Sequence, residues 1–159
     1  FIRQDELRVK RMWLTLLDFK IGDEALSKKL SEDFLELLPT RTLLFPHTIE
    51  VLHYLQDKGY YLHLITNGFE KVQQGKLASS GLAPFFREVI TSESSGSLKP
   101  HKEIFEYALH RTGARLTESL MIGDNWEADV AGALAVGMHA VHANYMAAPQ
   151  PAKPTYSIS

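Results

Sequence analysis

The sequence predicts an α/β fold in which a helical N-terminal segment precedes a Rossmann-like parallel sheet covered by helices. Two observations carry this prediction. Residues 2–38 have apolar side chains at helical spacing. From Tyr60 onward, short apolar runs alternate with amphipathic stretches that end at glycines, a pattern typical of buried parallel strands and their covering helices.

The N-terminal segment predicts two helices that form a hairpin. Its apolar positions at helical spacing are Leu7, Met12, Leu14, Leu17, Leu26, Leu30, Phe34, Leu37 and Leu38. Gly22 permits a turn between the two helices, and the carboxylate of Asp23 can cap the second one. We therefore expect a helical subdomain over residues 1–45 and a core over residues 46–159, with the boundary in the connection that precedes Thr48.

The elements of the core follow in order. Thr48 is expected to cap a helix that runs to Lys58 and ends at Gly59. The predicted strands are Tyr60–Ile65, Glu88–Thr91, Ser119–Ile122, His139–His142 and, more weakly, Thr155–Ile158. The predicted helices between them are Phe69–Ser80, Lys102–Thr112 and Trp126–Val136.

Composition and charge exclude several classes of function. The net charge is -2, and no run of Lys and Arg is present, so neither a nucleic-acid polymer nor a membrane is an expected partner. The absence of cysteine excludes disulfides and thiolate zinc sites and fits a reducing compartment, so we expect a cytoplasmic protein. The seven histidines form no close pair on one helical face, and we expect them to pack, cap or lie at the surface.

Three polar signals follow predicted strands, where parallel α/β sheets bind their ligands. Thr66, Asn67 and Gly68 offer a hydroxyl, an amide and a flexible backbone to an anion, although each alone also suits an ordinary turn. Lys99 precedes Pro100, which restricts its backbone, and its ammonium could neutralise phosphoryl oxygens. Taken alone, this signal also suits an exposed, solvated lysine before a helix.

The third signal is a pair of acids. Asp124 ends a predicted strand and Asp129 lies in the first turns of the next helix, so the two carboxylates can meet. Clustered carboxylates hold Mg²⁺, although acids also stabilise helix starts through the helix dipole. The three signals are separated by about one βα unit each, and this combination is more specific than any one of them.

These segments resemble motifs II, III and IV of the haloacid dehalogenase superfamily. The matching residues are Leu64–Phe69, Leu98–Pro100 with Glu103–Phe105, and Met121–Asn125 with Asp129. The helices before Pro46 resemble the helical cap of the capped members, so the resemblance covers nearly the whole chain. Residues 66–70 with Val72 and Gln73 resemble the pyrimidine-type nucleoside 5′-monophosphatases.

The resemblance implies a Mg²⁺-dependent phosphohydrolase that acts through an aspartyl-phosphate on a small phosphorylated metabolite, with a nucleoside 5′-monophosphate as one candidate. It implies that Thr66 binds the phosphoryl group and that Lys99 stabilises its charge and holds the nucleophile. Asn67 and Gly68 would donate further hydrogen bonds to the phosphate. Asp124 would ligate Mg²⁺, and Asp129 would support the metal site.

The family's D-x-D motif, which supplies the nucleophile and the general acid/base from the central strand, is absent from this sequence. Asp18 follows apolar residues, but Lys20 stands where the second acid should be. We therefore expect the motif before Phe1, on about 60 further residues of the native protein. This chain alone is then expected to be inactive and to lack the middle strand of its sheet.

Three other functions are compatible with parts of this pattern. A carbon–halogen hydrolase of the same fold needs no metal, so the pair Asp124 and Asp129 argues against it. A phosphate- or metal-sensing pseudoenzyme would fit the absent nucleophile. A sugar-phosphate mutase would differ from a phosphatase in its product.

Overall fold

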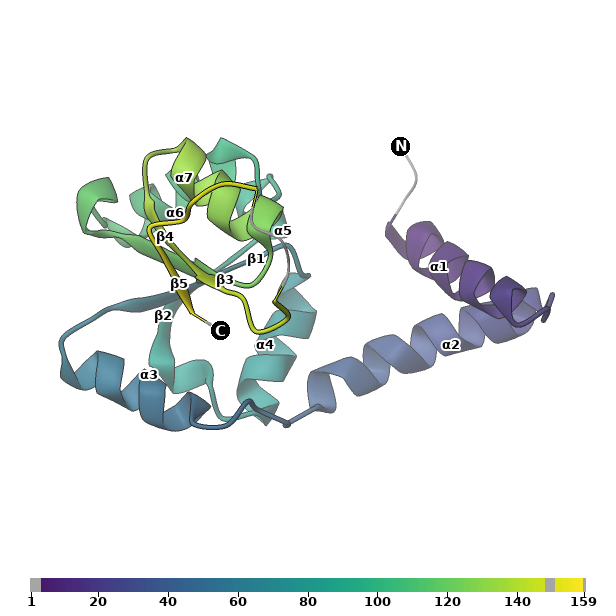
Figure 1. The fold of residues 1–159 in the computed structure, drawn as a ribbon. Helices are drawn as coiled ribbons and strands as arrows, with labels where there is room; N and C mark the ends of the chain where they lie inside the picture. The colour runs from purple at the N-terminus through teal and green to yellow at the C-terminus, as the bar shows by residue number, and fades with distance from the viewer. Residues whose placement is uncertain (1–3, 148–150, 159) are drawn as a thin grey trace. The chain divides into compact units, whose positions relative to one another are not determined.

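The structure is a computed structural model that describes residues 4–147 and 151–158 (Figure 1). The chain divides into two compact units. The first contains residues 1–48 and 71–83, and the second contains residues 49–70 and 84–159. Across the described ranges, no helix is long and apolar enough to cross a membrane.

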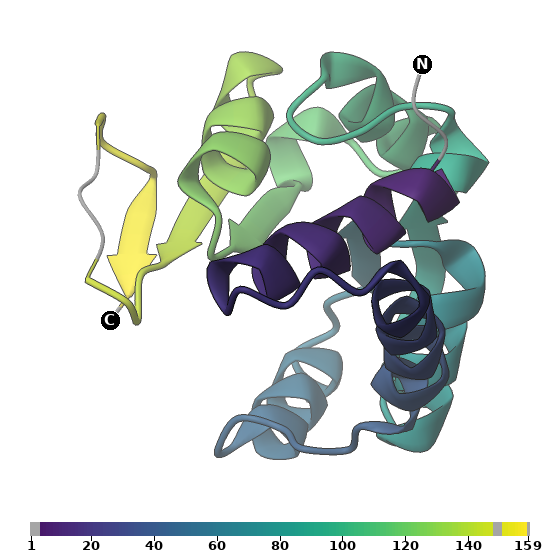
Figure 2. The ribbon, with the colours of Figure 1, turned by 90° about the vertical axis from the view of Figure 1, so that its right-hand side faces the viewer.

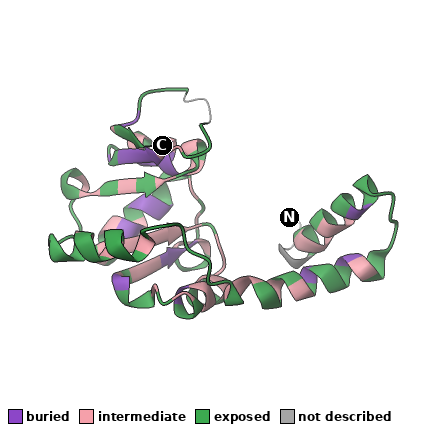
Figure 3. Ribbon diagram, turned by 60° about the horizontal axis from the view of Figure 1, so that its bottom comes forward, coloured by how far each residue is buried: buried purple, intermediate pink, exposed green. Residues whose placement is uncertain are grey.

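The first unit is built on the predicted helical hairpin. Helix α1 (Gln4–Asp18) and helix α2 (Glu24–Leu37) pack against each other, and a short 3-10 turn, η1 (Leu38–Thr40), follows. The backbone N–H of Leu26 donates to Asp23 Oδ1 at 2.9 Å, which confirms the predicted cap. Exposed residues predominate along both helices (Figure 3).

Helices α3 (Thr48–Asp57) and α4 (Glu70–Ser79) span the boundaries between the units. Thr48 begins α3, but its hydroxyl donates to the Phe45 carbonyl at 2.8 Å. The contacts group most of α4 with the hairpin, and a Cβ at Gly75 would lie 2.7 Å from Pro39 Cβ. The predicted division into a subdomain over residues 1–45 and a core over 46–159 stays a prediction.

The second unit contains two parallel sheets. One pairs β1 (Leu62–Thr66) with β2 (Phe86–Thr91), and the other has the order β3 (Leu120–Gly123), β4 (His139–Ala143), β5 (Tyr156–Ile158) (Figure 2). The predicted α/β class is confirmed. Within the described ranges β1 pairs only with β2 and β3 pairs only with β4, so each has one unpaired edge. The described strands thus form two separate sheets, and the expected absence of a middle strand stays a prediction.

The core of the second unit lies between β2, β4 and helices α6 (Lys102–Thr112) and α7 (Gly132–Ala135). Its buried members are Ile90, Ile104, Phe105, Ala108, Val130, Ala133, Met138 and Ala140. A Cβ at Gly132 would lie 2.9 Å from the Phe105 ring and 3.0 Å from Pro100 Cα, so a glycine is needed where α7 approaches α6.

The helix after β3 differs from the single α-helix predicted over residues 126–136. It begins with π-helical turns, η4 (Trp126–Ala131), and continues as the short α7. The backbone carbonyl of Asn125 accepts hydrogen bonds from the N–H groups of Asp129 and Val130. The side-chain Oδ1 of Asn125 accepts a hydrogen bond from Ala128 N at 2.8 Å. These bonds widen the first turn and bring the Asp129 side chain back toward the strand end.

Candidate phosphate and metal site

Three loops of the second unit carry the predicted site residues. The first, residues 66–69, follows β1 and enters α4. The second runs from the short helix α5 (Ser92–Ser95), after β2, to Lys99 before α6. The third, residues 124–125, follows β3. All three follow the carboxyl ends of strands in the two parallel sheets, which is where α/β sheets bind their ligands.

Lys99 connects the end of β1 with the helix that follows the third loop. Its Nζ donates to the Ile65 carbonyl of β1 at 2.8 Å and lies 2.6 Å from Asp129 Oδ1. The Lys99 side chain is only 12% exposed and that of Asp129 7%, so the ion pair is largely shielded from water. Although the pair is close, the ammonium is not aligned for a hydrogen bond, and Asp129 Oδ1 accepts none.

The backbone of Lys99 is held by Asn67. Lys99 N donates to Asn67 Oδ1 at 2.7 Å, and Asn67 Nδ2 donates back to the Lys99 carbonyl at 3.0 Å. The peptide bond between Lys99 and Pro100 is cis. The Asn67 side chain therefore joins the first two loops, and its predicted role as a phosphate donor stays a prediction.

Thr66 and Gly68 lie together at the end of β1. Gly68 N donates to Thr66 Oγ1 at 3.0 Å, so the turn folds its backbone toward the threonine hydroxyl. Glu93 of α5 accepts the N–H of Glu70 at 2.7 Å, which ties the start of α4 to the second loop. The hydroxyl and backbone amides of residues 66–68 thus lie on the loop whose strand end receives the Lys99 ammonium.

Asp124 and Asp129 are held by different groups. Asp129 Oδ2 accepts the N–H of Asn125 at 3.1 Å, so its carboxylate lies directly behind the strand end. A Cβ at Gly123 would lie 2.4 Å from Asp129 Cβ, which explains why a glycine ends β3. Asp124 itself is exposed.

Two residues at the end of β4 contact Asp124, and the sequence predicted neither contact. Tyr145 donates its hydroxyl to Asp124 Oδ2 at 3.0 Å. His142 Nε2 lies 3.2 Å from the Asp124 carbonyl, and the buried His142 ring also packs edge-on against Trp126, with ring centroids 5.4 Å apart. The available signal was the position of both residues at the carboxyl end of a strand.

The contact with Asp124 also raises the pKa of Tyr145 above its ordinary value of 10.0. The main cause is the hydrogen bond to the carboxylate, because deprotonation would remove the donor and place a phenolate beside an anion. Partial burial of the hydroxyl and the charge of Asp124 act in the same direction. Tyr145 is therefore a neutral donor at neutral pH.

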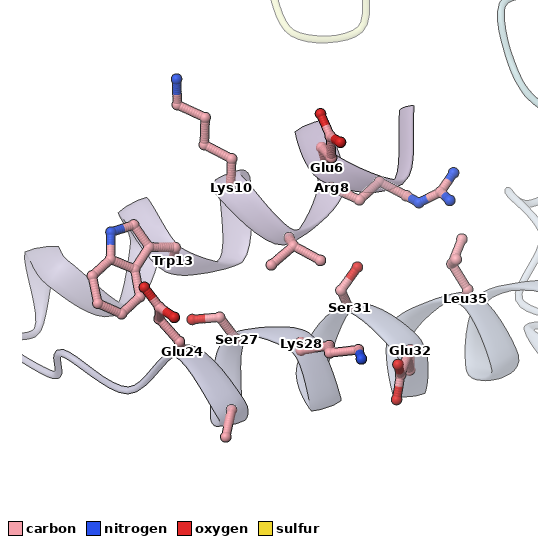
Figure 4. Close-up of a pocket in the computed structure, with 12 residues that line it drawn as sticks. Glu6, Arg8, Lys10, Trp13, Glu24, Ser27, Lys28, Ser31, Glu32 and Leu35 are labelled. Atoms are coloured by element: carbon pink, nitrogen blue, oxygen red, sulfur yellow. The ribbon is translucent and has the colours of Figure 1, made fainter. Parts of the chain in front are cut away.

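A separate cavity lies in the first unit, between α1 and α2 (Figure 4). It has a volume of about 910 Å³, and its lining includes Arg8, Trp13, Ser27 and Ser31. Ser27 donates its hydroxyl to the Asp23 carbonyl of its own helix at 2.8 Å. This cavity contains none of the predicted site residues.

The sequence from residue 7 to residue 137 matches the haloacid dehalogenase-like hydrolases. The chain belongs to this family. The structure of the hydrolase YfnB from Bacillus subtilis, bound to magnesium, superposes with a TM-score of 0.88 at 28% identity and covers 99% of this chain and 69% of that one. The resemblance inferred from the three motifs is confirmed.

Two curated relatives of this haloacid dehalogenase-like hydrolase are phosphatases. The pyrimidine 5′-nucleotidase YjjG of Escherichia coli is 31% identical over 134 residues, which are 82% of this chain and 59% of that protein. The glyceraldehyde 3-phosphate phosphatase of Methanothermobacter thermautotrophicus is 42% identical over 100 residues, which are 63% of this chain and 44% of that protein. The chain thus spans about half the length of the curated relatives it matches.

The family typically depends on Mg²⁺, and the carboxylates present here fit that ion. Mg²⁺ is often held by one or two carboxylates together with waters and substrate phosphate. Asp124 is exposed, and Asp129 has a buried oxygen that accepts no hydrogen bond. Among the described residues, no group of three or more His, Cys, Asp or Glu side chains could hold a metal ion.

Proposed function

We propose that the native protein is a Mg²⁺-dependent phosphatase that hydrolyses a small phosphomonoester through an aspartyl-phosphate. The observation that carries the proposal is the position of the Lys99 ammonium, 2.8 Å from the Ile65 carbonyl and 2.6 Å from Asp129 Oδ1. A cation bonded to the end of β1 and paired with Asp129 supports a site for an anion, because the hydroxyl and amides of residues 66–68 follow the same strand end. The phosphatase activity of two relatives supports the same chemistry.

We further propose that a strand outside this sequence lies between β1 and β3 and carries the nucleophilic aspartate. The unpaired edges of these two strands support this position, because each leaves a row of backbone N–H and C=O groups without a strand partner. Lys99 spans the same interval, from the end of β1 to Asp129 behind the end of β3. An aspartate at the end of the inserted strand would lie beside this ammonium.

In the proposed reaction, a carboxylate oxygen of that aspartate attacks phosphorus, and the bond from phosphorus to the ester oxygen breaks. The leaving alcohol takes up a proton from a general acid. Water then attacks the phosphorus of the aspartyl-phosphate, loses a proton to the same group, and releases inorganic phosphate and the free carboxylate.

This chain would supply the surroundings of that reaction. Lys99 and the loop of Thr66 and Gly68 would bind the phosphoryl oxygens, and Asn67 would keep the Lys99 backbone in place. Asp124 would hold Mg²⁺, with Asp129 in support through Lys99 and Asn125. When bound, the ion would neutralise negative charge on the phosphoryl group.

For the substrate we propose a nucleoside 5′-monophosphate. The match to the E. coli pyrimidine 5′-nucleotidase covers 82% of this chain, whereas the match to the M. thermautotrophicus glyceraldehyde 3-phosphate phosphatase covers 63%. A triose phosphate is the alternative that the second relative supports.

A phosphate-release screen of the native full-length protein tests the proposal. The substrates are pyrimidine nucleoside 5′-monophosphates, a triose phosphate, a hexose phosphate and a 2-haloacid, each with Mg²⁺ and with EDTA. We expect Mg²⁺-dependent phosphate release that is fastest with a nucleoside monophosphate, and no release from the 159-residue chain alone. Halide release without a metal, isomerised sugar phosphate, or activity of the 159-residue chain would contradict the proposal.

A further inference from the structure

Asp124 is held at two points by the end of β4. Tyr145 donates to Asp124 Oδ2 at 3.0 Å, and His142 Nε2 lies 3.2 Å from the Asp124 carbonyl. One contact fixes the side chain and the other the backbone of the same residue. Asp129, by contrast, is held by Asn125, which lies just before its own helix, and by Lys99 of the second loop.

The tyrosine contact has a directional consequence. Asp124 is exposed, so its carboxylate would otherwise rotate in water. With Oδ2 engaged by Tyr145, Oδ1 is the oxygen left to a cation, since no hydrogen bond to it is present among the described residues. Because Tyr145 donates to Oδ2, the Asp124 carboxylate is expected to bind a cation in a monodentate manner through Oδ1. Groups that orient a metal ligand in this way commonly change metal affinity 10–100-fold.

We propose that Tyr145 is a positioning residue for Mg²⁺, acting through Asp124. This inference rests on the proposed function, because it requires Asp124 to be a metal ligand. Tyr145 touches neither the substrate nor the ion in this role. Tyr145 is 50% exposed, so removing its hydroxyl leaves no buried cavity and should not disturb folding.

The test compares Tyr145→Phe with the unmodified full-length protein. Binding of Mg²⁺ is measured by calorimetry and binding of Mn²⁺ by electron paramagnetic resonance, both without substrate. We expect roughly tenfold weaker binding of both ions, at the lower end of the usual range because the tyrosine is exposed to competing water. The Mg²⁺ concentration for half-maximal phosphate release should rise by the same factor, with kcat unchanged at saturating Mg²⁺.

Tyr156→Phe is the matched control, since it removes one exposed tyrosine hydroxyl from β5 at a distance in sequence from Asp124. It should leave metal affinity unchanged. Equal affinity in Tyr145→Phe and the unmodified protein, tighter binding in Tyr145→Phe, or a fall in kcat alone would each overturn the positioning role. Loss of metal binding in Asp124→Asn with no effect of Tyr145→Phe would refute only this inference, whereas an unmodified protein that binds neither ion would refute the proposed function as well.

Discussion

At the scale of single residues, Lys99 is the described residue that links the most parts of the candidate site. Its backbone is held by Asn67, and its ammonium reaches both the end of β1 and Asp129. A buried carboxylate that loses its cation is left without compensation, which costs more than the pair contributes as a whole. The same contacts that prepare the site therefore also stabilise the fold.

Lys99→Met is expected to lower the free energy of unfolding by about 3 kcal/mol, because it leaves the Asp129 carboxylate buried and unpaired. Urea unfolding followed by circular dichroism measures this change. Lys102→Met is the control, since Lys102 pairs with Glu106 on an exposed helix surface and should cost about 0.5 kcal/mol or less. Equal losses in the two variants would mean that Lys99 is not a buried partner.

His63 is expected to make the free energy of unfolding depend on pH. Burial lowers its pKa below the ordinary value of 6.5, while Glu88 opposes this shift and Arg87 adds to it. Its Nδ1 is buried without a hydrogen-bond partner. Because the unfolded chain takes up the proton at a higher pH than the folded chain, the free energy of unfolding should fall as pH drops below about 6.5.

Urea unfolding at pH 7.5 and pH 5.5 tests this prediction. His63→Gln should reduce the loss of stability between the two pH values, because the glutamine does not titrate. His110→Gln, at an exposed position on α6, should leave the loss as it is. An identical loss in the His63 variant would show that its burial does not contribute to the pH dependence.

At the scale of elements, the strand end before Asp124 depends on a glycine. Gly123→Ala would place a Cβ 2.4 Å from Asp129 Cβ, so the π-helical turn must shift. We expect a loss of about 1–3 kcal/mol in unfolding free energy and weaker Mg²⁺ binding. Gly22→Ala is the control, because its nearest contact would be Trp13 at 3.9 Å. Equal stability and metal affinity in both alanine variants would contradict the close packing at Gly123.

Helices and strands were predictable where the spacing of apolar residues agreed with the residues that begin and end the element. Helix α6 begins at Lys102 and ends at Thr112 as predicted, because its apolar positions face the core and Gly113 follows in the left-handed region. Helix α5 was not predicted, since four residues are too few to show the helical repeat of apolar side chains. The π-helical start of η4 was also missed, because it depends on the hydrogen bonds of Asn125 and Asp129.

The candidate site was predictable to the level of its loops. Strand polarity predicted that Thr66, Lys99 and the acid pair follow strand ends, and the ion pair of Lys99 with Asp129 joins the second loop to the helix that follows the third. The reciprocal bonds of Asn67 with Lys99 join positions 32 residues apart, and the contact of Tyr145 with Asp124 joins positions 21 apart. Such pairs depend on where the chain returns in space, which no local pattern encodes.

At the scale of the whole molecule, the divided sheet is the main feature. An unpaired strand edge offers its backbone N–H and C=O groups to another strand, and both β1 and β3 have such an edge in the described chain. The proposed strand would pair with both edges and join the two sheets into one. Its aspartate would complete the site at the same place.

Hydrogen exchange distinguishes the divided sheet from a joined one. The amides of β1 and β3 should exchange faster in the 159-residue chain than in the native full-length protein, because a strand protects them only in the latter. β4 provides the internal reference, since it is paired with β3 and β5 in both. Equal protection of β1 and β3 in the two proteins would exclude a strand between them.

The central claim is that the three loops bind one phosphate together with one divalent ion. Calorimetric titration of the full-length protein with inorganic phosphate at saturating Mg²⁺ measures this directly, in the unmodified protein and in Thr66→Val, Lys99→Met and Asp124→Asn. The account predicts that each variant binds phosphate at least tenfold more weakly, and that removing Mg²⁺ weakens binding in the unmodified protein but adds little in Asp124→Asn. Phosphate binding that is unchanged in all three variants and indifferent to Mg²⁺ would contradict it.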